Sequence, residues 1–184
     1  MVVGIVIGAI VVILVLFVIG CYNKLVKAKL TVEEAFSTMD VYLKKRFDLI
    51  PNLVETVKGY ASHEKETLEK VVALRNQNYD SMSDDEKVAN GAAISQAIPK
   101  IMAIAEAYPD LKANTNFLEL SGQLQAVEND IANSRKYYNG AVKRYNMACQ
   151  TIPSNIIAGM FHFETKKLFE VESTEERQNV KVEF

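Results

Sequence analysis

One stretch decides the fold class of this chain: residues 117–152, FLELSGQLQAVENDIANSRKYYNGAVKRYNMACQTI. Apolar and small side chains recur in it at alternating spacings of three and four, which places them on one face of a helix. We predict a long amphipathic helix with a coiled-coil-like seam, capped by Asn114 or Thr115 and ended by Pro153. The seam positions are Phe117, Leu120, Leu124, Val127, Ile131, Ser134, Tyr138, Ala141, Tyr145, Ala148 and Ile152.

Working back along the chain, residues 83–108 predict a second helix. Ser83 and Glu86 form a capping box at its start, Pro99 should bend it, and Pro109 should end it. Residues 22–79 carry two further apolar stripes on either side of Pro51. The segments 22–47, 51–78 and 83–108 would each be about 40 Å long as helices, which suits a bundle with short connections.

We therefore predict an all-α fold, an up-and-down four-helix bundle preceded by a single N-terminal transmembrane helix. In this interpretation residues 48–50 form a tight turn, and Pro51 occupies the favoured first position of a new helix. The alternative is one kinked helix across Pro51, because the spacing of apolar residues nearly keeps its phase there.

The membrane prediction rests on residues 1–22, which contain no charged side chain; the first charge is Lys24. About 20 apolar residues suffice to cross a bilayer core of about 30 Å. A cleavable signal peptide should carry a basic start, which is absent here. Residues 18–21, VIGC, also resemble a lipoprotein signal, in which Cys21 would be lipidated.

The orientation follows from the basic residues after the span. Lys24, Lys27 and Lys29 follow it directly, whereas only the terminal amine precedes it. Such residues prefer the cytoplasmic side. We expect a single-pass protein of the cell membrane with its bundle in the cytoplasm; a lipoprotein would instead place the domain outside.

The chain thus divides into an anchor (1–22), a helical bundle (23–152) and a C-terminal part (153–184). The last part begins with a short apolar segment and continues from Glu164 as a charged tail without periodicity, expected to be extended or disordered. The apolar segment could cap the bundle, dip into the membrane surface or dock a partner. Its candidate interaction residues are Ile156, Ile157, Met160, Phe161 and Phe163.

Composition excludes some classes of protein. The formal net charge is -2, so the strongly basic face of a nucleic-acid-binding protein is missing. The two cysteines, Cys21 and Cys149, make no disulfide framework. Cys149 falls on the long apolar stripe and is interpreted as a small buried hydrophobe.

Several blocks together resemble the LemA family of bacterial membrane-anchored proteins. The blocks are residues 32–36 (VEEAF), 40–60 (DVYLKKRFDLIPNLVETVKGY), 108–114 (YPDLKAN), 135–139 (RKYYN) and 153–158 (PSNIIA). The resemblance implies a helical bundle on one N-terminal span and supplies no agreed reaction or cofactor. It also implies an association with membrane organisation, and with membrane proteases as candidate partners.

Candidate chemical sites are sparse. His63 and Glu64 suggest a metal site, but Thr67 stands where a zinc-protease helix needs its second histidine. Arg46 and Arg135 lie close to apolar stripes, so each is expected to be a charge inside the bundle with a carboxylate partner such as Glu128.

Two larger groups of side chains resemble sites, but their residue types and spacing favour structural roles. The charged and polar residues near Pro51 are expected to form an exposed network that fixes the turn, and the tyrosines of the last helix are expected to belong to the core. The first group is Asp40, Lys44, Arg46, Asp48, Asn52 and Glu55, and the second is Tyr137, Tyr138 and Tyr145.

These observations predict a non-enzymatic, membrane-anchored scaffold or adaptor without a cofactor, metal or catalytic residues. Its expected partners are the lipid bilayer, other membrane proteins such as a membrane protease, and copies of itself, but not nucleic acid. The alternatives are a metal-binding or hydrolytic protein that uses His63 and Glu64, or a lipoprotein anchored through Cys21.

Overall fold

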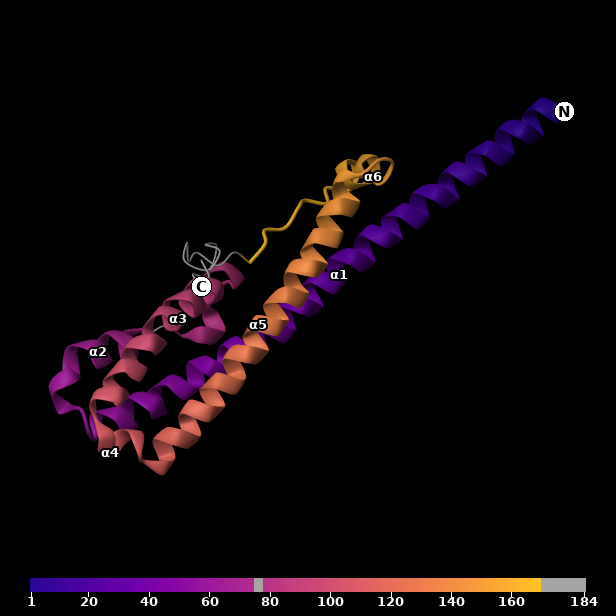
Figure 1. Cartoon of the computed structure of the whole chain (residues 1–184). Helices are drawn as coiled ribbons and strands as arrows, with labels where there is room; N and C mark the ends of the chain where they lie inside the picture. The colour runs from indigo at the N-terminus through magenta and orange to yellow at the C-terminus, as the bar shows by residue number, and fades with distance from the viewer. Residues whose placement is uncertain (75–77, 170–184) are drawn as a thin grey trace, which may run out of the picture. The chain divides into compact units, whose positions relative to one another are not determined.

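A computed structural model describes residues 1–74 and 78–169 (Figure 1). These residues form helices and no β-strand, which confirms the predicted all-α fold. The α-helices are α1 (Val2–Lys58), α2 (Lys65–Ala73), α3 (Asp84–Ala107), α4 (Pro109–Lys112), α5 (Thr115–Gln150) and α6 (Ser154–Met160), with short 3₁₀ turns η1 (Ser62–Glu64) and η2 (Tyr79–Ser81).

The predicted helix break at Pro51 is wrong, because α1 continues through Pro51 to Lys58. A proline inside a helix costs about 3 kcal/mol. Beyond it, however, Leu53, Val54 and Val57 are at most 1% exposed. Full burial of such a side chain contributes about 1.5–3 kcal/mol, so three of them outweigh the proline.

Helix α1 ends at Lys58, about two turns beyond the turn predicted at residues 48–50. Gly59 follows the last helical residue, and glycine costs about 1 kcal/mol in a helix interior. The predicted helix over residues 51–78 is accordingly split between the end of α1, η1 and the nine-residue α2. Residues 75–77 of that prediction lie outside the described part.

The local signals for the later helices are confirmed. Ser83 and Glu86 form both bonds of a capping box at the start of α3, which contains Pro99. Asn114 accepts a hydrogen bond from the Phe117 N–H at 3.0 Å at the start of α5. Every predicted seam position of α5 is buried or half-buried except Ile152, which follows the helix and is exposed.

The chain divides into two compact units, and both long helices contribute to each. The first unit comprises residues 1–38 and 134–168, and the second comprises residues 39–133 with Phe169. The predicted boundaries at residues 22 and 153 mark changes in composition and stay a prediction. The core of the first unit contains Leu25, Val32, Ala35, Ala141, Val142, Tyr145, Cys149, Ile157 and Ala158.

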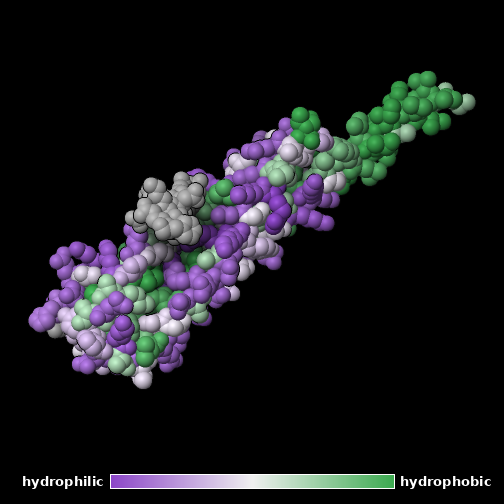
Figure 2. Space-filling model, in the orientation of Figure 1, coloured by the Kyte–Doolittle hydropathy of each residue, from purple (hydrophilic) through white to green (hydrophobic). Residues whose placement is uncertain are grey.

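The start of α1 is the hydrophobic segment that the sequence predicted. Residues 1–17 are all exposed, and Figure 2 shows their uninterrupted hydrophobic surface. Among the described residues, α1 alone is long and apolar enough to cross a membrane. At the other end, residues 163–169 have no regular secondary structure, and the rest of the predicted disordered tail, residues 170–184, lies outside the described part.

Candidate functional site

The first unit contains the predicted interaction segment, and its position depends on a tight connection after α5. Pro153 cannot continue a helical hydrogen-bond ladder, and α5 ends at Gln150. The Ser154 hydroxyl then donates to the Ala148 carbonyl oxygen at 2.6 Å. This bond ties the start of α6 to the last turn of α5.

The predicted interaction segment has two faces. Ile157 is 4% exposed and belongs to the core of the first unit, and Phe163 packs against that core. Ile156, Met160 and Phe161 are exposed by 60%, 65% and 48%. Part of the segment therefore caps the core, as one of the three interpretations predicted, and three large apolar side chains remain uncovered by the described chain.

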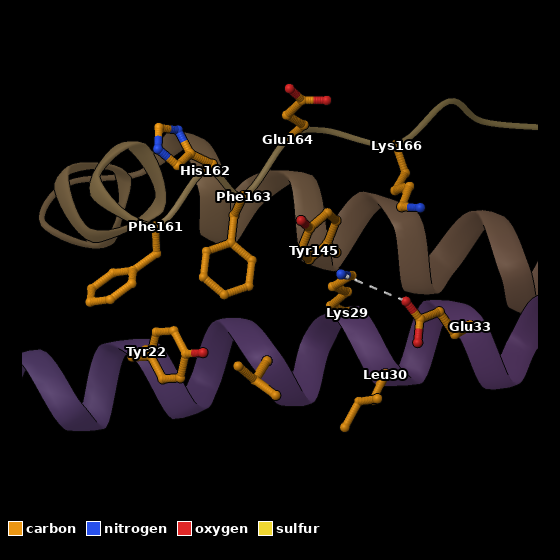
Figure 3. A pocket seen from close by; sticks show the side chains of 11 residues that line it. Tyr22, Lys29, Leu30, Glu33, Tyr145, Phe161, His162, Phe163, Glu164 and Lys166 are labelled. Atoms are coloured by element: carbon orange, nitrogen blue, oxygen red, sulfur yellow. Dashed lines mark ion pairs between the residues drawn. The ribbon is translucent and has the colours of Figure 1, made fainter.

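Three aromatic rings bring this segment to α1 (Figure 3). The rings of Tyr22 and Phe161 have their centroids 4.8 Å apart, and those of Tyr22 and Phe163 are 5.7 Å apart in an edge-on arrangement. Tyr22 was missed as a site residue. The available signal was its place as the last aromatic residue before the first charge.

The end of α6 is fixed by a Schellman motif. The Phe163 N–H donates to the Ala158 carbonyl at 2.9 Å, and the His162 N–H donates to the Gly159 carbonyl at 3.4 Å. His162 has φ 57, in the left-handed region that usually takes glycine. The turn directs the chain back along α5.

The returning segment is held by the side chain of Asn146. Its amide donates to the Lys166 carbonyl at 2.8 Å and accepts from the Lys166 N–H at 2.8 Å. The Tyr138 hydroxyl donates to the Lys167 carbonyl at 3.2 Å. These bonds hold residues 164–168 against α5, although the segment has no regular secondary structure.

A groove of about 500 Å³ lies between α1, α5 and the segment after α6 (Figure 3). It combines an aromatic wall with two lysines and two glutamates, of which Lys29 and Glu33 are 3.9 Å apart. The lining residues are Tyr22, Val26, Lys29, Leu30, Glu33, Tyr145, Phe161, His162, Phe163, Glu164 and Lys166.

The lining of this groove includes a buried tyrosine, Tyr145. Tyr145 is 1% exposed, and burial together with a hydrogen bond to Cys149 raises the pKa of its hydroxyl well above the ordinary value. The group stays protonated at neutral pH. Cys149 is 8% exposed, which confirms its interpretation as a buried hydrophobe. Cys21 is half-buried and packs against the same core, and its lipidation stays a prediction.

The second unit contains the predicted buried charge. Arg46 is 1% exposed, and its guanidinium donates to Glu128 at 2.8 Å and to the Ser95 hydroxyl at 2.8 Å. It also donates to the Gly91 carbonyl at 2.7 Å. The predicted pairing of Arg46 with Glu128 is confirmed. The sequence did not predict a role for Gly91, because that role depends on which helix packs against it.

The charges near Pro51 do not form a turn network, because there is no turn. Asp40 instead accepts hydrogen bonds from the Tyr79 hydroxyl at 2.7 Å and from Lys87 at 2.8 Å. Lys44 pairs with Asp80 at 3.0 Å rather than with Asp40. Both ammonium groups lie over the Tyr79 ring, at 5.3 Å for Lys44 and 5.2 Å for Lys87.

The other members of that group point elsewhere. Asp48 and Asn52 are exposed, and Glu55 pairs with Lys58 at 2.8 Å, one helical turn away. These contacts are ordinary features of a helix surface.

The remaining candidates are His63 and the tyrosines of α5. His63 is exposed in η1. Within residues 1–74 and 78–169, no group of three or more His, Cys, Asp or Glu side chains could hold a metal ion. Of the tyrosines, Tyr138 packs its ring 5.8 Å from that of Phe36, whereas Tyr137 is 46% exposed, so the prediction that Tyr137 belongs to the core is wrong.

Comparison with known proteins identifies a family. Protein LemA of Metamycoplasma hominis is 25% identical over 161 residues, which cover 85% of this chain and 72% of that protein. The sequence model of the LemA family matches residues 35–184. The matched region contains the buried Arg46 cluster and all of α6. With most of its length and both of these features inside the match, the chain belongs to the LemA family.

Proposed function

We propose that this protein is a non-enzymatic, membrane-anchored scaffold that holds other membrane proteins, or copies of itself, beside the bilayer. The observation that carries the proposal is the continuity of α1. The helix runs unbroken from the uncharged residues 1–22 into the core of the first unit, against which Val18 and Cys21 pack. Anchor and first unit share one helix without a linker, which suits a protein that works by position.

The buried polar groups of the second unit support a scaffold over an enzyme. Arg46 on α1 bonds to groups on α3 and α5, and Tyr79 bonds to Asp40 of α1. Such bonds hold helices in register. These side chains are therefore engaged in interhelical contacts rather than placed beside a reacting group.

Anchoring is tested by a charge in the middle of the span. Leu14→Arg should release the protein from membranes during alkaline carbonate extraction, because an arginine at the centre of a spanning helix costs about 2.5–3.5 kcal/mol. Leu118→Arg is the matched control, since Leu118 is an exposed leucine of α5 and 55% accessible. Release of both variants, or of neither, would contradict the anchor.

The scaffold role is tested by a change of position. A photo-crosslinking residue at Tyr137 or Met147, both exposed on α5, should give a discrete protein adduct in native membranes. A flexible ten-residue insertion between Tyr22 and Asn23, directly after the proposed span, should abolish that adduct while leaving the protein in the membrane. An adduct that survives the insertion would show that position does not matter.

The alternatives have their own measurements. Stoichiometric zinc in the purified protein, lost in His63→Ala, would favour a metal-binding function. A mature protein that begins at a lipid-modified Cys21, measured by intact mass, would favour a lipoprotein.

A further inference from the structure

We propose that the exposed face of α6 is a second membrane contact, seated in the headgroup layer of the bilayer beside the end of the span. This inference rests on the proposed anchoring of residues 1–22 and names the surface on which the first unit meets the lipid. The partner is the lipid bilayer itself rather than a protein.

The composition of residues 151–163 suits contact with lipid. Residues 151–163 contain no Lys, Arg, Asp or Glu. Ile152, Ile156 and Met160 follow one another at intervals of four, and they are 82%, 60% and 65% exposed. Ile156 and Met160 are four residues apart inside α6 and therefore lie on one side of it, and Ile152 adds an exposed apolar side chain just before the helix. Figure 2 shows hydrophobic surface on α6.

The residues that follow α6 pack against the end of the proposed span. Phe161 and Phe163 both contact Tyr22, which ends the uncharged stretch of α1. Tyrosine is enriched where a spanning helix meets water. If residues 1–22 span the bilayer, Tyr22 lies at that boundary, and the rings packed on it lie at the same depth. The exposed ring of Phe161 then lies where the apolar surface of the span ends.

Helix α6 is held in place by the protein itself, before any contact with a membrane. The Ser154 bond to Ala148 fixes its start, the turn at His162 fixes its end, and Asn146 holds the chain that follows at Lys166. A pre-formed apolar face loses little conformational entropy on insertion, unlike a flexible tail. Apolar faces of this kind lie in the plane of the membrane interface.

The residues of α1 that follow Tyr22 are rich in positive charge. Beyond Tyr22 the first charged residues of α1 are Lys24, Lys27 and Lys29, and all three are basic. Basic side chains next to an apolar face are attracted to the phosphates of anionic lipids.

The experiment uses the absence of tryptophan from the chain, so that one substitution gives one fluorophore. Full-length Phe161→Trp is reconstituted in vesicles of phosphatidylcholine and phosphatidylglycerol, with or without bromine on the acyl chains. We expect a blue-shifted emission and a clear loss of intensity in the brominated vesicles. Met160→Trp serves as a second reporter in case the aromatic cluster is disturbed.

Two further variants make the result interpretable. Leu14→Trp, inside the span, should be quenched strongly if the anchor inserts. Tyr137→Trp should not be quenched, because Tyr137 adjoins Tyr138, whose partner Phe36 lies about 21 Å beyond Tyr22 along α1. Circular dichroism confirms that each variant is folded.

The outcomes separate the two proposals. Quenching at Leu14→Trp but at neither Phe161→Trp nor Met160→Trp overturns the contact by α6 and leaves the anchor intact. A protein adduct from a photo-crosslinker at Ile156 in native membranes, combined with unquenched reporters, would assign this face to a protein partner instead. Without quenching at Leu14→Trp, the anchor fails and the inference fails with it.

Discussion

Arg46 shows how a single residue can hold three helices of the second unit. Its three acceptors come from α3 and α5, while the residue itself lies on α1. Removing one partner of a buried ion pair is strongly destabilising, whereas a well-packed apolar replacement is tolerated better. The side chain of Glu128 is 34% exposed, so water relieves part of the strain if Arg46 is lost.

Gly91 should be the least replaceable glycine of the second unit. A Cβ there would lie 3.0 Å from the Arg46 guanidinium and 3.1 Å from Leu43. Gly91→Ala should lower the free energy of unfolding by about 1–3 kcal/mol, because the guanidinium cannot move without breaking its bond to the Gly91 carbonyl. Urea denaturation followed by circular dichroism measures the change.

Gly122→Ala is the control for this substitution. Gly122 also lies inside a helix, and nothing stands within 4 Å of its added Cβ. We expect stabilisation by about 0.5–1 kcal/mol, the usual gain from alanine in a helix. Equal effects at both glycines would remove the steric argument for Gly91.

Tyr79 should make the second unit sensitive to alkali. Burial, and then its hydrogen bond to Asp40, raise the pKa of Tyr79 above its ordinary value of 10.0. Because the folded state holds this proton more tightly than the unfolded state, its contribution is complete below about pH 10 and is lost as pH rises further. As pH rises from about 9 to about 11, a window of about two units around that pKa, Tyr79→Phe should lose less stability than the unchanged protein. Parallel curves for both proteins would show that Tyr79 does not carry the effect.

At the scale of elements, α1 shows that a proline signal can be overridden. Pro51 favours the start of a helix, yet the apolar face continues through it with Phe47 and Ile50 buried before it and Val54 buried after it. The choice depends on what packs against that face, which the local sequence does not contain.

The continuity of α1 can be measured as a distance. Nitroxide labels at Val41 and Glu55, both exposed, should report a separation of about 21 Å between their attachment points in a continuous helix. Cys21 and Cys149 are replaced by alanine so that only the two engineered sites react. A substantially shorter distance would restore the turn at Pro51.

The start of α3 should depend on its capping box. Ser83→Ala should destabilise the fold by about 1 kcal/mol at neutral pH, within the usual range of about 0.5–2 kcal/mol for a lost cap. Hydrogen bonds from Ser83 lower the pKa of Glu86, so the carboxylate supports the cap above the ordinary pKa of 4.5 and loses this role as pH falls. The difference between the proteins should therefore shrink in acid.

Thermal denaturation at several pH values measures this effect. Ser37→Ala serves as the control, because Ser37 is an exposed residue inside α1 and caps nothing. A loss of stability in Ser37→Ala as large as that in Ser83→Ala would show that capping is not the cause.

At the scale of the whole molecule, the proposed anchor would determine which compartment the helical units occupy. Lys24, Lys27 and Lys29 follow the span and predict that the units lie in the cytoplasm. Ser81→Cys, at an exposed position in η2, should resist a membrane-impermeant thiol reagent on intact cells and react after permeabilisation. Ready labelling of intact cells would reverse the orientation and favour the lipoprotein alternative.

The sequence alone determined the all-α class, the buried face of α5, the caps of α3 and α5, and the hydrophobic start of α1. These features depend on residues within a few turns of each other, and helical periodicity makes them readable. It also indicated the pairing of Arg46 with Glu128, because a charge beside an apolar stripe needs a partner. Only the tertiary structure decided that α1 passes through Pro51, that Gly91 must be small, and that α6 lies against Tyr22. Each of these results from contacts between segments far apart in the chain, whose packing energy exceeds the local preference.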